Sequence, residues 1–180
     1  GAGVMDLYAA TTTPAVIINS ETGLSKVNLK EIDEDTTFTL TVENFSDETV
    51  TYAVYGTVGT DLILSGDNYG EEQGIFIEGT ISDDAPWNGE FPISFVFDDE
   101  TVIETVYGDV YNIIEIPEES SVDFDVTIDL SNAVDWASNA PLQDIFSNGT
   151  FVEGFVSLKS VDDTVPELSI PYLGFYGEWD

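Results

Sequence analysis

Alternation of apolar and polar residues is the main pattern along this chain. In residues 122–130 every even-numbered position is apolar, whereas the odd-numbered positions are Asp123, Asp125, Thr127 and Asp129. Successive side chains of a β-strand point to opposite faces, so this stretch predicts a strand with one buried and one hydrated face.

The same period of two recurs in shorter stretches. Phe38, Leu40 and Val42 alternate with polar residues, and a second run after the turn-like residues 44–48 contains Val50 and Tyr52. The two runs predict a β-hairpin.

A second hairpin is predicted from residues 91–97 and 102–107, which the acidic link Asp98-Asp99-Glu100 separates. Further strand candidates are residues 74–81, 113–116, 150–161 and 167–176, which brings the expected total to about nine or ten short strands.

Helical spacing is rare. Residues 1–12 have Val4, Leu7 and Tyr8 at helical intervals, and Pro14 should end any helix there. A second short helix is expected within residues 132–146, capped by Ser131-Asn132 and interrupted by Pro141. Many short strands with little helix favour an all-β fold, an antiparallel β-sandwich.

The charge of the chain excludes several partners. Its 180 residues contain 36 Asp and Glu against 3 Lys and Arg, a formal net charge of −33. Phosphate recognition needs clustered basic residues, so we expect no binding to nucleic acid or to an anionic membrane surface. The sequence has no apolar run long enough to cross a membrane, so we expect no membrane insertion. The N-terminus has no basic flank followed by an apolar stretch, so we expect no signal peptide there.

The residue types that are missing restrict the chemistry. The chain has no His and no Cys, which excludes a Ser-His-Asp or Cys-His pair, the usual zinc sites and disulfides. The adjacent pairs Ser25-Lys26 and Lys159-Ser160 do not support a Ser-Lys dyad, since neighbouring side chains on a strand point apart. We therefore predict no catalytic residue, no cofactor-binding residue and no dedicated metal ligand.

Calcium is an open alternative for the acidic middle of the chain. The pair Asp83-Asp84, the cluster Asp98-Asp99-Glu100 and the loop at residues 67–72 offer the carboxylates that calcium prefers. None of these segments has the ligand spacing of an EF-hand, and acidic pairs arise by chance among so many acids.

The tryptophans suggest a second alternative. Trp87, Trp136 and Trp179 can either be buried or form a sugar-stacking platform, and Trp87, in the turn-rich residues 85–89, is the one most expected to be exposed. A surface-binding module for a glycan or a host protein is therefore the second functional hypothesis. The other Phe and Tyr stripes are expected to form the core.

The two ends of the chain resemble a known arrangement of domains. Gly1-Ala2-Gly3-Val4-Met5-Asp6-Leu7-Tyr8-Ala9-Ala10 is similar to the closing segment of a subtilisin-like catalytic domain. Residues 151–156 and 168–177 resemble the end of the fibronectin-type-III-like domain that follows it in cell-envelope serine proteinases of the lactocepin and streptococcal complement-cleaving types. Residues 26–32, 38–46 and 126–131 are similar to strands of that domain.

The resemblance implies a division of the chain and a role for it. Residues 1–14 would close the catalytic domain, and residues 15–180 would form a fibronectin-type-III-like sandwich with an acidic insertion at about residues 57–113. The catalytic triad would lie upstream of Gly1, so this chain would be an inert accessory domain of a secreted or cell-surface bacterial endopeptidase. Its partners would be the catalytic domain of the same polypeptide and the protein substrate.

The net charge leads to a first testable prediction. Repulsion among like charges destabilises the compact state, and added salt screens it over a distance of about 10 Å at 0.1 M. The melting temperature should therefore rise as NaCl increases from about 0.05 to 1 M, as followed by circular dichroism. A flat or falling curve would show that repulsion is insignificant.

Overall fold

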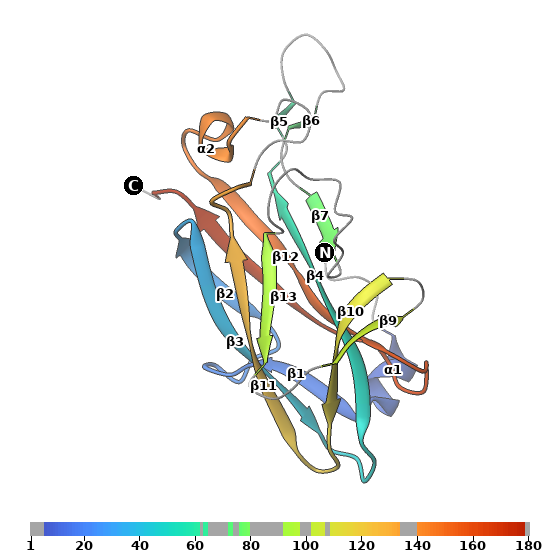
Figure 1. Ribbon diagram of the computed structural model, residues 1–180. Coiled ribbons are helices and arrows are strands. Elements are labelled where there is room, and N and C mark those ends of the chain that lie inside the picture. The colour runs from blue at the N-terminus through green and yellow to red at the C-terminus, as the bar shows by residue number, and fades with distance from the viewer. Residues whose placement is uncertain are drawn as a thin grey trace.

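Two stacked β-sheets form the body of the protein in a computed structural model (Figure 1). The structure describes residues 6–61, 63–64, 72–73, 76–79, 92–97, 102–106, 109–133 and 140–178. The first sheet has the strand order β1-β3-β11-β8, and the second has the order β2-β13-β12-β4-β10-β9, with β7 also paired to β4. All pairs are antiparallel except β2 with β13, which run parallel.

The elements, in chain order, are α1 (Leu7–Thr12), β1 (Ala15–Asn19), β2 (Val27–Ile32), β3 (Asp35–Asn44), β4 (Val50–Thr60), β5 (Ile63–Leu64), β6 (Glu72–Gln73), β7 (Phe76–Gly79), β8 (Ile93–Phe97), β9 (Val102–Val106), β10 (Asp109–Ile116), β11 (Ser121–Asp129), α2 (Leu142–Ile145), β12 (Thr150–Ser160) and β13 (Leu168–Tyr176). Strands β5 and β6 pair with each other. The sandwich predicted from the alternating pattern is confirmed.

The core lies between the facing sheets. Strand β11 buries Phe124, Val126 and Ile128, the alternate positions that its sequence pattern marks as apolar. On the second sheet, the side chains of Tyr52 in β4 and Tyr172 in β13 are almost completely buried. Apolar burial of this kind is the main favourable term in folding.

Both predicted hairpins are wrong in their pairing. Strand β3 belongs to the first sheet and β4 to the second, so the chain crosses between the layers after Asn44. In the same way β8 pairs with β11, whereas β9 pairs with β10 in the other sheet. Two strands that face one core from opposite sides have the same alternating pattern. The pattern therefore shows which face of a strand is buried, but not which sheet the strand belongs to.

The helices are short, as expected, but the second one begins later than its predicted cap. Helix α1 begins after Asp6, whose carboxylate accepts a hydrogen bond from the N–H of Ala9 at 3.0 Å, and ends before Pro14. Helix α2 follows Pro141, which precedes it instead of interrupting it; the missing N–H of proline costs little at a helix start. Ser131 instead bonds back to the carboxylate of Asp129. None of the described helices is long and apolar enough to cross a bilayer.

Asn44 joins two turns at one end of the sandwich. Its side chain is 2% exposed, and its amide nitrogen donates to the carbonyls of Glu48 at 2.8 Å, Ile116 at 3.1 Å and Pro117 at 2.9 Å. Its side-chain oxygen accepts from the N–H and hydroxyl of Ser46. The buried amide therefore satisfies backbone groups of the β3–β4 and β10–β11 connections together.

A second polar contact lies where β12 approaches β4. The hydroxyl of Tyr172 donates to the carbonyl of Thr57 at 2.6 Å, and a Cβ added at Gly154 would lie 1.9 Å from the same oxygen. Burial, together with the negative charge of Glu153, raises the pKa of Tyr172, and burial raises the pKa of Tyr52 to about 12. Both phenols are therefore neutral at physiological pH.

Replacing Asn44 should destabilise the whole domain. Asn44→Ala leaves buried carbonyls of the two turns without donors, and we expect the free energy of unfolding in urea to fall by about 1–3 kcal/mol. The control is Asn28→Ala, because Asn28 is exposed and accepts one hydrogen bond, from the N–H of Lys30 at 3.2 Å. Equal losses in the two variants would contradict the role of Asn44.

Gly154 should not tolerate a methyl group. We expect Gly154→Ala to lower the free energy of unfolding by about 3 kcal/mol, the upper end of the cost of overpacking. Tyr172→Phe removes only the hydrogen bond to Thr57 and should cost about 1 kcal/mol. If urea unfolding ranks the two variants in the opposite order, the close approach of β12 to β4 is not the controlling contact.

Candidate interaction surface

Several of the sequence candidates lie outside the described residues. This applies to Trp87, Trp136 and Trp179, to Asp83-Asp84 and to Asp98-Asp99-Glu100. Within the part of the chain that the structure describes, no three acidic side chains lie close enough together to hold a metal ion. The calcium and tryptophan hypotheses therefore stay predictions.

The two Ser-Lys pairs form no nucleophilic site. Ser160 is buried, and its hydroxyl donates to the carboxylate of Asp162 at 3.1 Å, whereas Lys159 lies on the opposite face of β12. Ser25 and Lys26 are both exposed ahead of β2.

An exposed apolar surface on the second sheet is the most distinctive feature of the described molecule. Phe151 and Phe155 of β12 are 38% and 36% exposed, and Leu173 of β13 is 44% exposed. Phe175 of β13 is half-buried beside them. We call these four residues the β12–β13 apolar face; it lies on the side of the second sheet that points away from the core.

The pairing of β12 with β13 places the residues of the β12–β13 apolar face next to one another. Phe151 pairs with Phe175, Glu153 with Leu173, and Phe155 with Pro171. The rings of Phe151 and Phe175 meet edge to face, with centroids 5.4 Å apart and an interplanar angle of 74°. Cross-strand aromatic pairs of this kind stabilise the sheet and keep their side chains in place.

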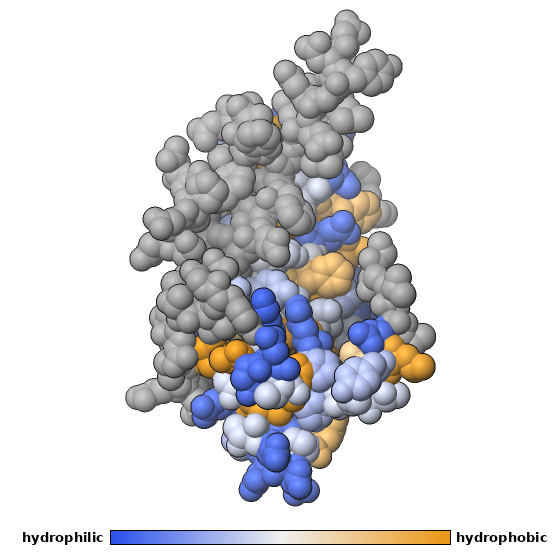
Figure 2. Space-filling model, turned by 90° about the vertical axis from the view of Figure 1, so that its right-hand side faces the viewer, coloured by the Kyte–Doolittle hydropathy of each residue, from blue (hydrophilic) through white to orange (hydrophobic). Residues whose placement is uncertain are grey.

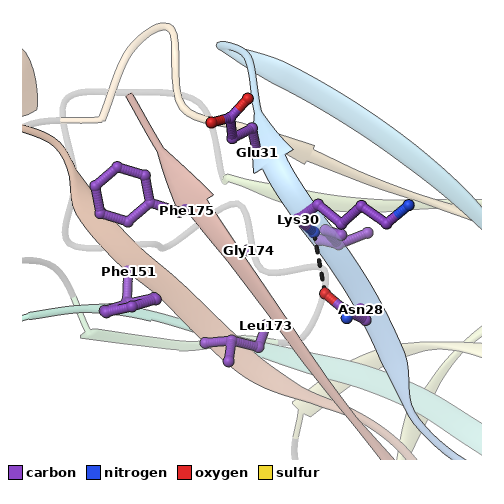
Figure 3. A pocket seen from close by; sticks show the side chains of 8 residues that line it. Asn28, Lys30, Glu31, Phe151, Leu173, Gly174 and Phe175 are labelled. Carbon is purple, nitrogen blue, oxygen red and sulfur yellow. Dashed lines mark hydrogen bonds between the residues drawn. The ribbon is translucent and has the colours of Figure 1, made fainter. Parts of the chain in front are cut away.

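A shallow groove runs from this face to the edge strand β2. It has a volume of about 590 Å³, and Figure 3 shows Phe151, Leu173 and Phe175 on one side of it and Asn28, Lys30 and Glu31 from β2 on the other. The register of β2 against β13 shifts between Leu173 and Gly174. Lys30 has a φ of 60°, and its N–H donates to the side chain of Asn28, so the irregular strand brings polar side chains to the rim.

Gly174 allows β2 to lie close to the floor of the groove. A Cβ at Gly174 would lie 2.8 Å from Cγ2 of Ile32 and 3.2 Å from Cβ of Leu29. Leu29 and Ile32 of β2 therefore cover Gly174 on the core side of the second sheet. The outward side of the sheet at the groove stays accessible.

Hydrophilic residues gather at one end of the sandwich. Figure 2 shows them at the lower tip of the molecule, and above the tip hydrophobic and hydrophilic areas lie side by side. In Figure 1 this tip is formed by the β3–β4 and β10–β11 connections, which contain Asp47, Glu48, Glu118 and Glu119.

Sequence reasoning missed the apolar face because it assigned the Phe and Tyr stripes to the core. That expectation is wrong for Phe151 and Phe155, since Val152 and Val156 occupy the inward positions of β12. The sequence of residues 151–156 could have indicated the exposed face, because both faces of this strand are apolar apart from Glu153 and Gly154. A strand that is apolar on both faces is either covered twice or exposed on one side.

Asn44-Phe45-Ser46 has the Asn-X-Ser pattern of an N-glycosylation acceptor. The Asn44 amide is buried and hydrogen-bonded as described above, so it is not accessible for modification in the folded protein.

Comparisons with known proteins agree with this architecture. Residues 27–173 match the family model described as an Fn3-like domain. The chain is 28% identical over 180 residues to C5a peptidase of Streptococcus pyogenes serotype M1, covering 99% of this chain and 12% of that protein. It is 24% identical over 185 residues to the PI-type proteinase of Lactococcus lactis subsp. cremoris, covering 100% of this chain and 8% of that protein.

Among solved structures, PapD-like domain 7 of human CEP192 is similar over 100% of this chain and 95% of that one, with 9% identity and a TM-score of 0.42. This likeness is too weak to carry any argument about function. The family match covers most of the chain and both sheets, and the curated relatives it resembles are far longer proteinases. The chain therefore belongs to the Fn3-like domain family.

Proposed function

We propose that this chain is a non-catalytic accessory domain of an extracellular subtilisin-like serine endopeptidase. The observation that carries the proposal is the extent of the match: nearly all of this chain aligns with about an eighth of a C5a peptidase. A domain without His or Cys has no ordinary hydrolase machinery of its own, so catalysis would belong to another part of the polypeptide.

Helix α1 supports a domain boundary near residue 14. None of its residues is buried, and Leu7 and Tyr8 are 70% and 76% exposed. An apolar pair at this exposure has no packing partner among the described elements of the sandwich. This is what we expect if residues 1–14 complete the preceding catalytic domain and residues 15–180 form the accessory domain.

The proposed role of the sandwich is to support the catalytic domain and to help shape the access of protein substrates. A β-sandwich is a rigid scaffold whose surfaces and loops can be adapted without changing the core. The proposed location is the outside of a bacterial cell, secreted or attached to the envelope. Its high negative charge suits a protein that must remain soluble.

A binding module for a glycan or host protein is the second candidate. The observation in its favour is the exposed pair Phe151 and Phe155, since exposed aromatic rings are common in recognition surfaces. Retention of the isolated chain on a glycan or matrix-protein array, lost in Phe155→Ser but kept in Val96→Ser, would favour this candidate.

The proposed function is tested on the parent polypeptide. The reading frame upstream of Gly1 should encode a nucleophilic serine in a Gly-rich segment, and deletion of residues 15–180 should abolish most casein hydrolysis or lower the melting temperature of the catalytic domain. The 180-residue chain alone should not cleave casein. A deletion variant with unchanged activity and stability would contradict the accessory role.

A further inference from the structure

We propose that the free edge of β8 binds an extended peptide segment of another protein that has an apolar centre and lysine or arginine at its flanks. The segment would add one strand to the first sheet, beside β8. This site goes beyond the proposed function and does not depend on it. The proposal rests on the hydrogen-bonding groups of the edge, on the packing that holds it in place and on the charge next to it.

The backbone of β8 is hydrogen-bonded on one side only among the described residues. Strand β8 ends the first sheet and pairs with β11 (Figure 1). The N–H of Asp129 donates to the carbonyl of Pro92 at 2.9 Å, and this bond sets the alternation of the ladder. Successive residues of a strand direct their N–H and C=O groups to opposite sides, so the even-numbered residues of β8 bond to β11. The residues whose backbone groups point away from β11 are Ile93, Phe95 and Phe97.

The other edges of the two sheets are less open to an added strand. On β1 the N–H and the carbonyl of Asn19 bond within the following turn, and the hydroxyl of Thr13 donates to the carbonyl of Ala15 at 2.9 Å. On β2 the register shifts, and β9 contains Glu104; irregular register and charge both hinder strand addition at an edge. The five residues of β8 carry no charge, and their register with β11 is regular. Pro92 stands before the strand and does not interrupt it.

Packing on two sides keeps β8 in place. The ring of Phe124 in β11 lies 6.3 Å from that of Phe95 and 5.0 Å from that of Phe97, measured between centroids. On the second sheet, a Cβ added at Gly56 of β4 would lie 2.5 Å from Cδ1 of Ile93, so the two strands are in close contact. An edge that is already ordered loses little conformational freedom when a peptide binds.

The second sheet extends past β8 and gives an added strand a surface to cover. Strand β4, which β8 contacts at Gly56, is followed in its sheet by β10, and β7 pairs with β4 from Gly56 to Gly59. A strand added to β8 would lie above β7 and β10, so its inward side chains would face a sheet. Phe95 and Phe97 are half-buried, and apolar residues of the peptide would remove their remaining exposed surface from water.

Acidic side chains lie next to this edge. Asp123 and Asp125 of β11 are exposed on the outward side of the first sheet, and Asp129 is half-buried there. In the register of β8 with β11, Asp125 lies opposite Val96. A residue added beyond Val96 is two strand spacings, about 10 Å, from Asp125, which the long side chain of lysine or arginine can bridge. None of the basic residues of the chain is in the first sheet: Lys26 precedes β2, Lys30 is in β2 and Lys159 is in β12.

These features select the occupant. Strand addition draws affinity from main-chain hydrogen bonds and specificity from alternate side chains, and a glycan has no such row of amide groups. A second copy of the chain would bring the same aspartates and another net charge of −33, so repulsion opposes the pairing of two β8 edges. A basic peptide has both the amides and the complementary charge.

Peptide binding and amide exchange test the proposal directly. The probe is a fluorescein-labelled synthetic peptide, Lys-Lys-Val-Thr-Val-Thr-Val-Lys-Lys, titrated with the 180-residue chain at low salt and followed by fluorescence anisotropy. At saturation, NMR should show amide exchange at Phe95 and Phe97 slowed by about tenfold or more, because these N–H groups gain partners. Exchange at Ser94 and Val96 should change less, since their N–H groups already bond to β11.

Matched variants separate the edge from the acidic surface as a whole. Ser94→Lys puts a positive charge on the outward side of β8, and Ser25→Lys puts the same charge at an exposed position ahead of β2. Both variants change the net charge equally, but only Ser94→Lys should raise the dissociation constant by about tenfold, because like charges then meet at the edge.

N-methylated peptides show whether main-chain hydrogen bonds hold the peptide. One version carries the methyl groups on its valines and another carries them on its threonines. Only one of these alternate sets of amides faces β8, so one methylated peptide should bind as before and the other should not bind.

The remaining outcomes overturn the proposal. Absence of binding up to about 1 mM peptide excludes the edge site. Binding that survives both sets of N-methyl groups, or that leaves exchange at Phe95 and Phe97 unchanged, means that the lysines only adhere to the acidic surface. Equal binding of a peptide with glutamate in place of lysine removes the role of Asp125. Slow exchange at Phe95 and Phe97 in the free chain means that the edge is already filled, by another segment of the chain or, if the protection grows with protein concentration, by a second copy.

Discussion

The structure depends on burying one face of each sheet while the carboxylates of an extremely acidic chain stay in water. A sandwich solves this constraint because each strand needs apolar residues only at alternate positions, and the remaining positions can be charged. Strand β11 follows this rule throughout, with Phe124, Val126 and Ile128 inside and three aspartates outside. The thin core between the layers therefore tolerates a high density of charge on the outward side of the first sheet.

Polar groups inside this core are few, and they serve to position the chain. The Asn44 side chain connects two turns, each of which crosses from one sheet to the other, and the Tyr172 hydroxyl binds the Thr57 carbonyl where Gly154 lets the strands approach. Buried hydrogen bonds contribute modestly to stability, but an alternative arrangement that left them unmade would be costly. They thus favour one packing of the two sheets over others with the same apolar pattern.

The outward sides of the two sheets differ, and this difference connects the fold to the proposed role. The outward side of the first sheet carries aspartate, glutamate and threonine beside the exposed Val96, whereas the outward side of the second sheet presents phenylalanine and leucine beside Glu153 and a shallow groove. An exposed apolar surface of this kind is suited to contact with another protein surface.

The sequence by itself determined the fold class, the end of the first helix before Pro14, and the lack of ordinary hydrolase residues. These follow from local physics: the two-residue period of strands, the missing N–H of proline, and the chemistry of the residue types present. The similarity at the two ends of the chain also predicted the family correctly. Pattern alone did not determine that β3 and β4, or β8 and β9, lie in different sheets, because both sheets face one core.

Only the tertiary structure decided which aromatic residues are core and which are surface. Phe124 alternates with aspartates in β11 and packs between the sheets, whereas Phe155 belongs to a strand that is largely apolar on both sides and lies outside. The physical reason is that burial depends on what covers a face, and in β12 it is Val152 and Val156 that point to the opposite sheet. Period two separates the two sides of a strand, and only packing decides which side is the inside.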